Sequence, residues 1–211
     1  MIPRRLVFHR YWPLLLCALL LGACLGPVHT TTLHTLQPVR QQPLALDWKN
    51  VHDLTLLMPV QLAPHLQVRG LLNQQTPGEA RASATHLWAG PLEQQVSQQI
   101  VAGLKDLLAT ENIAAFPGPR FGTIRYQIEV ELNEFSGNGQ QFNTTAVYTL
   151  SDAAAKTILA RKTFRHTLPI DKPEHSSYVA SASQAIADLS TEIAAALLAA
   201  RRMQPEPQSR P

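Results

Sequence analysis

The chain has 211 residues, of which 45% are hydrophobic and 16% are charged, with 18 lysines and arginines against 15 aspartates and glutamates. Residues 1–23 hold three of the arginines and no acid, so the rest of the chain is electrically balanced and lacks the basic surface expected of a nucleic-acid-binding protein. This length suits one domain with a substantial core.

The first 23 residues have the features of an export signal. Three arginines precede an apolar run from Pro13 to Ala23, which is 11 residues long. A helix of that length rises about 16 Å, roughly half of a hydrocarbon core, so we do not expect a permanent transmembrane span. The run ends in Leu21, Gly22 and Ala23, directly before Cys24.

These four residues resemble a bacterial lipobox, with Leu21, Gly22 and Ala23 as the recognition sequence of the signal peptidase. The resemblance implies cleavage of residues 1–23, a diacylglycerol on the Cys24 sulfur and an N-acyl lipid such as palmitate on the new amino terminus. A thiolate is the nucleophile that this alkylation requires, and two or three acyl chains hold a protein stably at a membrane. The alternative is an ordinary secretory peptide that happens to contain a cysteine.

Residues 24–30 are expected to form a lipidated tether, and strands and loops follow it. Residues 31–36 are rich in threonine and end near a proline, which predicts a short edge strand. The apolar run over residues 53–60 predicts a central strand. A further strand is predicted over residues 65–72, followed by a surface loop over residues 73–78.

An amphipathic helix is predicted to begin after Pro91, since proline suits the first helical turn. Its apolar residues recur at three- and four-residue spacing and polar residues occupy the opposite side, so the helix should cover one face of a sheet. We expect it to end near Glu111 and Asn112. The apolar positions are Leu92, Val96, Ile100, Leu104, Leu107 and Leu108.

The second half of the chain has the clearest strand pattern. Apolar and polar residues alternate over residues 124–133, which predicts that Ile128 faces the core and Glu129 faces solvent. Two more strands are predicted over residues 142–150 and 157–168. Short loops should join all three into an antiparallel meander.

A second long helix is predicted from Ser176 or Ser177 to Arg202, with a narrow apolar stripe filled in by alanines. Residues 203–211 are polar and rich in proline, which predicts a disordered tail. These elements predict a single α+β domain over residues 31–202. Its sheet is expected to be antiparallel-rich, with two long amphipathic helices packed on one face.

The order of these features resembles the PqiC-type lipoproteins, which are also described as ABC-type transport auxiliary lipoproteins. The similarity covers roughly residues 24–200. Leu87 and Gly90 depart from it, because the family often has an arginine and an acid at these positions. The residues that carry the resemblance are the lipobox, His34-Thr35-Leu36, Trp88-Ala89 before Pro91-Leu92, the meander with its turn at Asp152, and the alanine-rich last helix.

The resemblance implies a non-catalytic subunit of an MCE-type intermembrane lipid-transport complex that supports envelope integrity. Its implied partners are an MCE-domain transport protein and a membrane, which the lipid on Cys24 enters, and self-association into a homo-oligomer is left open. Leu25 follows the cysteine in place of the aspartate that typically retains lipoproteins in the inner membrane. Sorting rules similar to those of enterobacteria therefore imply a periplasm-facing protein anchored in the outer membrane.

Trp88 and Pro91 are the predicted interface residues, because tryptophan is enriched in protein interfaces. The alternative for Trp88 is a ring packed on the sheet at the entry to the helix, since large aromatic residues usually serve the fold.

No enzyme is predicted. The eight histidines form no pair at the i,i+4 spacing of helical zinc sites, and the sequence has no glycine-rich phosphate loop or nucleophile motif. We therefore expect no catalytic residue, metal or other cofactor beyond the covalent lipid. Two other functions stay open. One is an outer-membrane lipoprotein that regulates a cell-wall synthase or assists outer-membrane assembly, and the other is an envelope hydrolase assembled from distant residues.

Overall fold

Strand β7 (Ile124–Gly137) is the centre of the sheet in this computed structural model. It pairs antiparallel with β8 (Gln141–Asp152), which in turn pairs antiparallel with β9 (Thr157–Pro169). The predicted meander is confirmed, and so is its phase, because Ile128 is fully buried whereas Glu129 is exposed. The structure describes residues 30–44, 53–76, 78–118 and 122–203.

On the other side of β7, three strands run parallel to it, each beside a different part of its length. β2 (Leu54–Leu57) pairs with its beginning and β3 (Gln61–Leu62) with its middle, while β4 (Gly70–Thr76) meets its end. β2 also pairs in parallel with β6 (Ile113–Ala115). The sheet of nine strands in the described part of the chain is therefore mixed, and the prediction of an antiparallel-rich sheet was wrong on this side.

β4 and β5 (Glu79–Trp88) form an antiparallel pair, and β1 (Thr32–His34) lies parallel to β5 at the edge of the sheet. The predicted edge strand is confirmed, but the predicted strand and loop over residues 65–78 were wrong in outline. A short 3-10 helix, η2 (Pro64–Leu66), comes first, and β4 then runs through most of the expected loop. The strand β5 had not been predicted.

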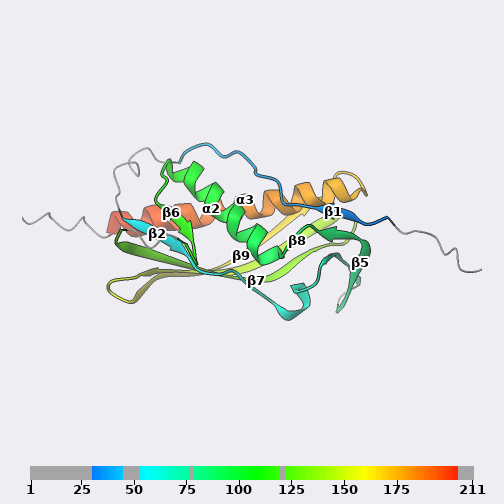
Figure 1. The fold of residues 1–211 in the computed structure, drawn as a ribbon, viewed down its shortest axis with the longest axis horizontal. Helices are drawn as coiled ribbons and strands as arrows, with labels where there is room; N and C mark the ends of the chain where they lie inside the picture. The colour runs from blue at the N-terminus through cyan, green and yellow to red at the C-terminus, as the bar shows by residue number, and fades with distance from the viewer. Residues whose placement is uncertain (1–29, 45–52, 77, 119–121, 204–211) are drawn as a thin grey trace, which may run out of the picture. The chain divides into compact units, whose positions relative to one another are not determined.

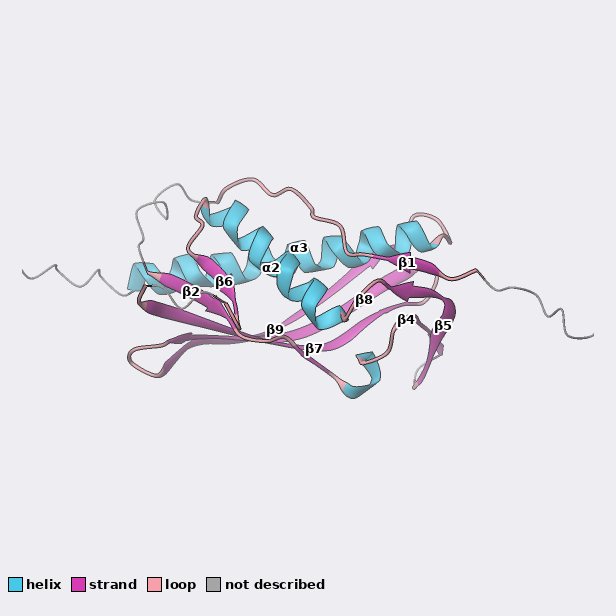
Figure 2. Ribbon diagram, viewed as in Figure 1, coloured by secondary structure: helices cyan, strands magenta, loops and turns pink. Residues whose placement is uncertain are grey.

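Helices α2 (Leu92–Leu108) and α3 (His175–Met203) lie together on one face of the sheet (Figures 1 and 2), as expected. α2 ends before the predicted position because Ala109 takes the left-handed conformation, with φ 49°. Small residues let the two helices approach closely, since a Cβ on Gly103 would lie 3.0 Å from the Cβ of Ser190. None of the helices in the described part of the chain has the length and apolar character that crossing a bilayer requires.

Residues 36–44 form a strap that follows β1 and runs across both helices, as the blue trace in Figure 1 shows. The backbone N–H of Leu36 donates to Oε1 of Gln95 on α2 at 3.0 Å, and that of Gln37 donates to Oγ of Ser183 on α3 at 2.9 Å. The strap therefore fixes the N-terminal strand to the helical layer. Further bonds join Gln41 to Ala187 (2.6 Å) and Thr191 (3.1 Å), and Leu44 to Leu107 (2.8 Å).

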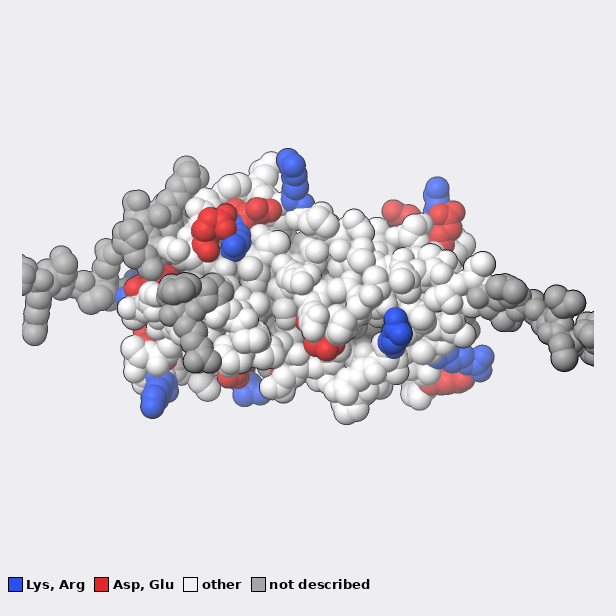
Figure 3. All heavy atoms as spheres, in the orientation of Figure 1, with Lys and Arg blue, Asp and Glu red and all other residues white. Residues whose placement is uncertain are grey.

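Charged side chains on the face shown in Figure 3 are few, and lysines and arginines lie next to acids near the margins. Such neighbours form short ion pairs, including Arg81 with Glu79 at 2.8 Å and Lys105 with Glu111 at 2.7 Å. This face therefore presents no large area of a single sign, in keeping with the balanced charge of residues 24–211.

Candidate functional site: a groove at the start of helix α2

The predicted lipid-attachment residue Cys24 lies outside the described residues, as do Leu21, Gly22 and Ala23 of its recognition sequence. The same holds for residues 204–211 of the predicted tail. The lipobox and the tether stay predictions from the sequence.

Trp88 ends strand β5 and lies in the core, with 3% of its surface exposed. Its backbone N–H donates to the carbonyl oxygen of Arg69 at 2.7 Å, and its ring lies against Phe135 with the ring centroids 6.2 Å apart. Edge-to-face contacts continue from Phe135 through Phe142 to Tyr178 on α3. Trp88 therefore has the packing role given above as the alternative, and its indole is not exposed as an interface anchor.

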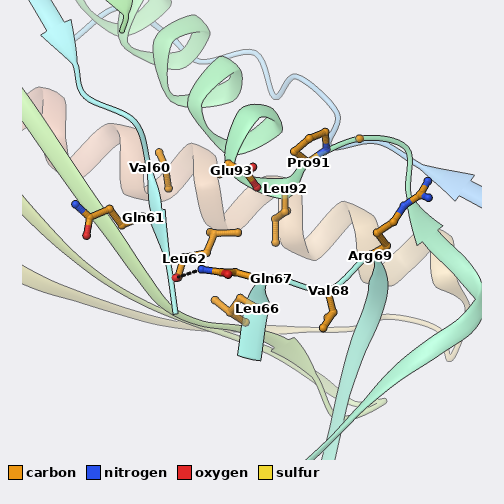
Figure 4. Close-up of a pocket in the computed structure, with 11 residues that line it drawn as sticks. Val60, Gln61, Leu62, Leu66, Gln67, Val68, Arg69, Pro91, Leu92 and Glu93 are labelled. Atoms are coloured by element: carbon orange, nitrogen blue, oxygen red, sulfur yellow. Dashed lines mark hydrogen bonds between the residues drawn. The ribbon is translucent and has the colours of Figure 1, made fainter. Parts of the chain in front are cut away.

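Pro91, the second predicted interface residue, is exposed and lines a groove beside the first turn of α2 (Figure 4). The groove has a volume of about 840 Å³. Strand β3, helix η2 with the residues that follow it, and the start of α2 surround it. Its apolar lining residues are Val60, Leu62, Leu66, Val68, Pro91 and Leu92.

The floor of the groove is fixed by the core, and its rim is open to solvent. Val60, Leu66 and Leu92 are each at most 5% exposed, whereas Val68 at the rim is 38% exposed. The side-chain amide of Gln67 donates to the carbonyl oxygen of Leu62 at 3.2 Å, the bond drawn in Figure 4. An apolar floor under a polar rim is typical of a surface that binds an apolar group.

Two charged residues stand at the rim. Glu93 lies in the first turn of α2, where the helix dipole favours an acid. Arg69 forms no ion pair within the described residues, so its guanidinium is available to a ligand. No serine, cysteine, threonine, histidine or lysine is among the residues that line the groove, which therefore offers contact surface and no nucleophile.

Sequence reasoning named Pro91 but missed the rest of the groove, because residues 65–72 had been assigned to a strand. A signal was present in Pro64, which takes the first turn of η2, the position in a helix that proline suits. The helix turns the chain between β3 and β4, so that residues from both sides of it line the groove.

A family model described as the ABC-type transport auxiliary lipoprotein component matches residues 34–194. The chain belongs to this family. The resemblance to the PqiC-type lipoproteins is thereby confirmed, and the protein is a lipoprotein auxiliary to a transport system.

Two solved structures share this fold. Protein XCC0632 from Xanthomonas campestris, of the DUF330 family, has a TM-score of 0.67 and 17% identity, over 82% of this chain and 98% of its own. A crystal structure of an uncharacterized protein has a TM-score of 0.66 and 20% identity, over 80% of this chain and 99% of its own. The PelC dodecamer from Paraburkholderia phytofirmans reaches a TM-score of 0.40 at 12% identity, over 71% of this chain and 93% of its own, too distant to carry an argument. No curated protein matches the chain.

Proposed function

We propose that the protein is a lipoprotein subunit of an MCE-type intermembrane lipid-transport complex, anchored in the outer membrane, that supports envelope integrity and catalyses no reaction itself. The family match over residues 34–194 carries this proposal, because the family is an auxiliary component of ABC-type transport systems. Leu25 after Cys24 supports the outer membrane as its destination.

The groove at the start of α2 is the surface we assign to the transport partner, an MCE-domain protein that presents an apolar segment. The buried floor supplies apolar area that a partner can cover, and the polar rim can orient it. Arg69 at the rim favours a partner with an acid beside its apolar segment.

The substitution Val68→Glu tests the groove. Val68 is 38% exposed, so the fold should tolerate the change, but it places a carboxylate in the apolar contact. We expect an MCE-domain protein to be recovered with the tagged wild-type chain from detergent-solubilised envelopes and to be lost with Val68→Glu. Ile158→Glu is the matched control, because Ile158 is 65% exposed on β9 and does not line the groove.

The outcomes separate the function from the surface. An MCE-domain protein recovered equally with all three chains keeps the proposed function and moves the docking surface away from the groove. A cell-wall synthase recovered in its place favours the alternative, a regulator of cell-wall synthesis or outer-membrane assembly.

Replacing Cys24 by serine tests the anchor. The hydroxyl cannot replace the thiol that is acylated, so unprocessed precursor is expected to accumulate and incorporation of a labelled fatty acid is expected to stop. Normal lipid labelling of Cys24→Ser would show that the cysteine is not the attachment site.

A further inference from the structure

Three histidines from three different elements meet at the edge of the sheet. His34 is the last residue of β1, His86 lies near the end of β5 and His175 begins α3. The His34 Nε2 and His86 Nδ1 atoms are 3.1 Å apart, a hydrogen bond. The His86 and His175 rings are stacked with their centroids 3.4 Å apart and their planes at 5°.

This arrangement needs neutral rings and does not suit a metal. A hydrogen bond between two imidazoles requires a proton on one nitrogen and a bare lone pair on the other, so it fails once both rings are protonated. The lone pairs of stacked His86 and His175 lie in parallel planes and cannot converge on one ion. Within the described residues no group of histidine, cysteine or acidic side chains could hold a metal.

The surroundings give little compensation for positive charge. The α3 residues that line a surface pocket with His34 are uncharged, among them Val179, Ala180 and Gln184. The charged neighbours of His175 in an adjoining pocket are Glu174, which accepts a hydrogen bond from Ser176, and Arg81 on β5, which is paired with Glu79. The N-terminus of α3, where His175 lies, also disfavours a cation.

Burial and the neighbouring histidines act in the same direction. Burial and then the charge of His86 lower the pKa of His34, and burial, His86 and His34 lower the pKa of His175, from an ordinary value of 6.5. The closed arrangement therefore binds fewer protons than the open chain does. Its stability is present above pH 6.5 and is lost as the pH falls below that value.

The cluster sits where the fold is held by few bonds. β1 is a strand of three residues with β5 as its pairing partner, and the next fixed point along the chain is Leu36, which is buried and bonded to α2. We propose that His34, His86 and His175 form an acid-sensitive latch that holds β1 on β5 at neutral pH and releases residues 32–35 when the histidines are protonated.

Release lengthens the free N-terminal segment of the body. Four residues add about 14 Å of reach between Cys24, where the sequence predicts the anchor, and the strap. The latch itself does not depend on the identity of the transport partner or on the groove.

Hydrogen exchange measured on the full chain in detergent at about pH 8 and about pH 5 tests the latch, with each rate corrected for intrinsic exchange. Protection of residues 32–35 is expected to fall by up to about tenfold for each pH unit in the window where opening takes up one proton. Residues 126–132 in β7 should keep their protection and serve as the internal control.

Three variants complete the test. His34→Gln with His86→Gln should remove the pH dependence of residues 32–35, and His65→Gln, at an exposed position on η2, should leave it unchanged. His175→Phe keeps a ring stacked on His86 while removing one basic group, so it should make the dependence shallower even if the double variant leaves β1 open at every pH. Equal protection at both pH values in the wild-type chain, or full pH dependence in the double variant, would overturn the latch.

Discussion

Replacing Ile128 by alanine is expected to lower the free energy of unfolding by about 2–5 kcal/mol. Ile128 is fully buried in the middle of β7, and its partner across the β7–β8 pair, Leu150, is fully buried as well. Removing three carbons from this position leaves a cavity that a rigid central strand cannot close. Urea denaturation of the full chain, followed by circular dichroism, measures the change as a lower midpoint.

Glu129→Ala is the matched control, one residue along the same strand. Its side chain is exposed on the opposite face, so the free energy of unfolding should change by less than about 0.5 kcal/mol. Because neighbouring residues of a strand face opposite ways, equal midpoints for the two variants would mean that the register of β7 is shifted by one residue.

Replacing Gly70 by alanine should be about as destabilising, at about 3 kcal/mol, through a steric effect. A Cβ on Gly70 would lie 2.3 Å from the carbonyl oxygen of Ser83 and 2.8 Å from its nitrogen. Both are backbone atoms of β5 and cannot rotate away, so the β4–β5 pair would have to separate. We expect a lower thermal midpoint, with protection from hydrogen exchange lost first in β5.

Gly90→Ala is the control for the cost of adding a methyl group to a glycine. A Cβ there would meet nothing within 4 Å, so the thermal midpoint should stay close to that of the wild-type chain. Equal losses for the two variants would show that the close approach of β4 to β5 is not what limits Gly70.

The parts of the fold that the sequence predicts are those with many residues in one period. β7, β8, β9 and both helices repeat their pattern often enough for apolar positions to be assigned to one face, as Ile128 shows. β2, β3 and β6 are two to four residues long, too short to display a period. Their parallel pairing depends on crossovers through distant residues and has no local signature.

β5 was missed for a different reason. Its first residues, Glu79 to Ala82, are exposed, so the apolar alternation that marks a half-buried strand is absent. Backbone bonds to β4 hold it in place, and these do not depend on side-chain type.

The candidate site divides in the same way. Cys24 and its lipobox are recognisable because the peptidase reads a local sequence, and Pro91 because its place at a helix start is local. Burial of Trp88 and the meeting of His34, His86 and His175 depend on which strands become neighbours. Spacing along the chain could exclude a helical zinc pair but could not predict contacts between residues 34, 86 and 175.

The strap determines how the body would respond to tension on its N-terminus. Because β1 is parallel to β5, a force along β1 loads its backbone bonds together in shear, whereas a sideways pull breaks them one after another from Thr32. Once β1 has yielded, the load passes to Leu36 on α2 and to Gln37 on α3. Tension is then divided between two helices, and β7 and the floor of the groove lie outside the loaded path.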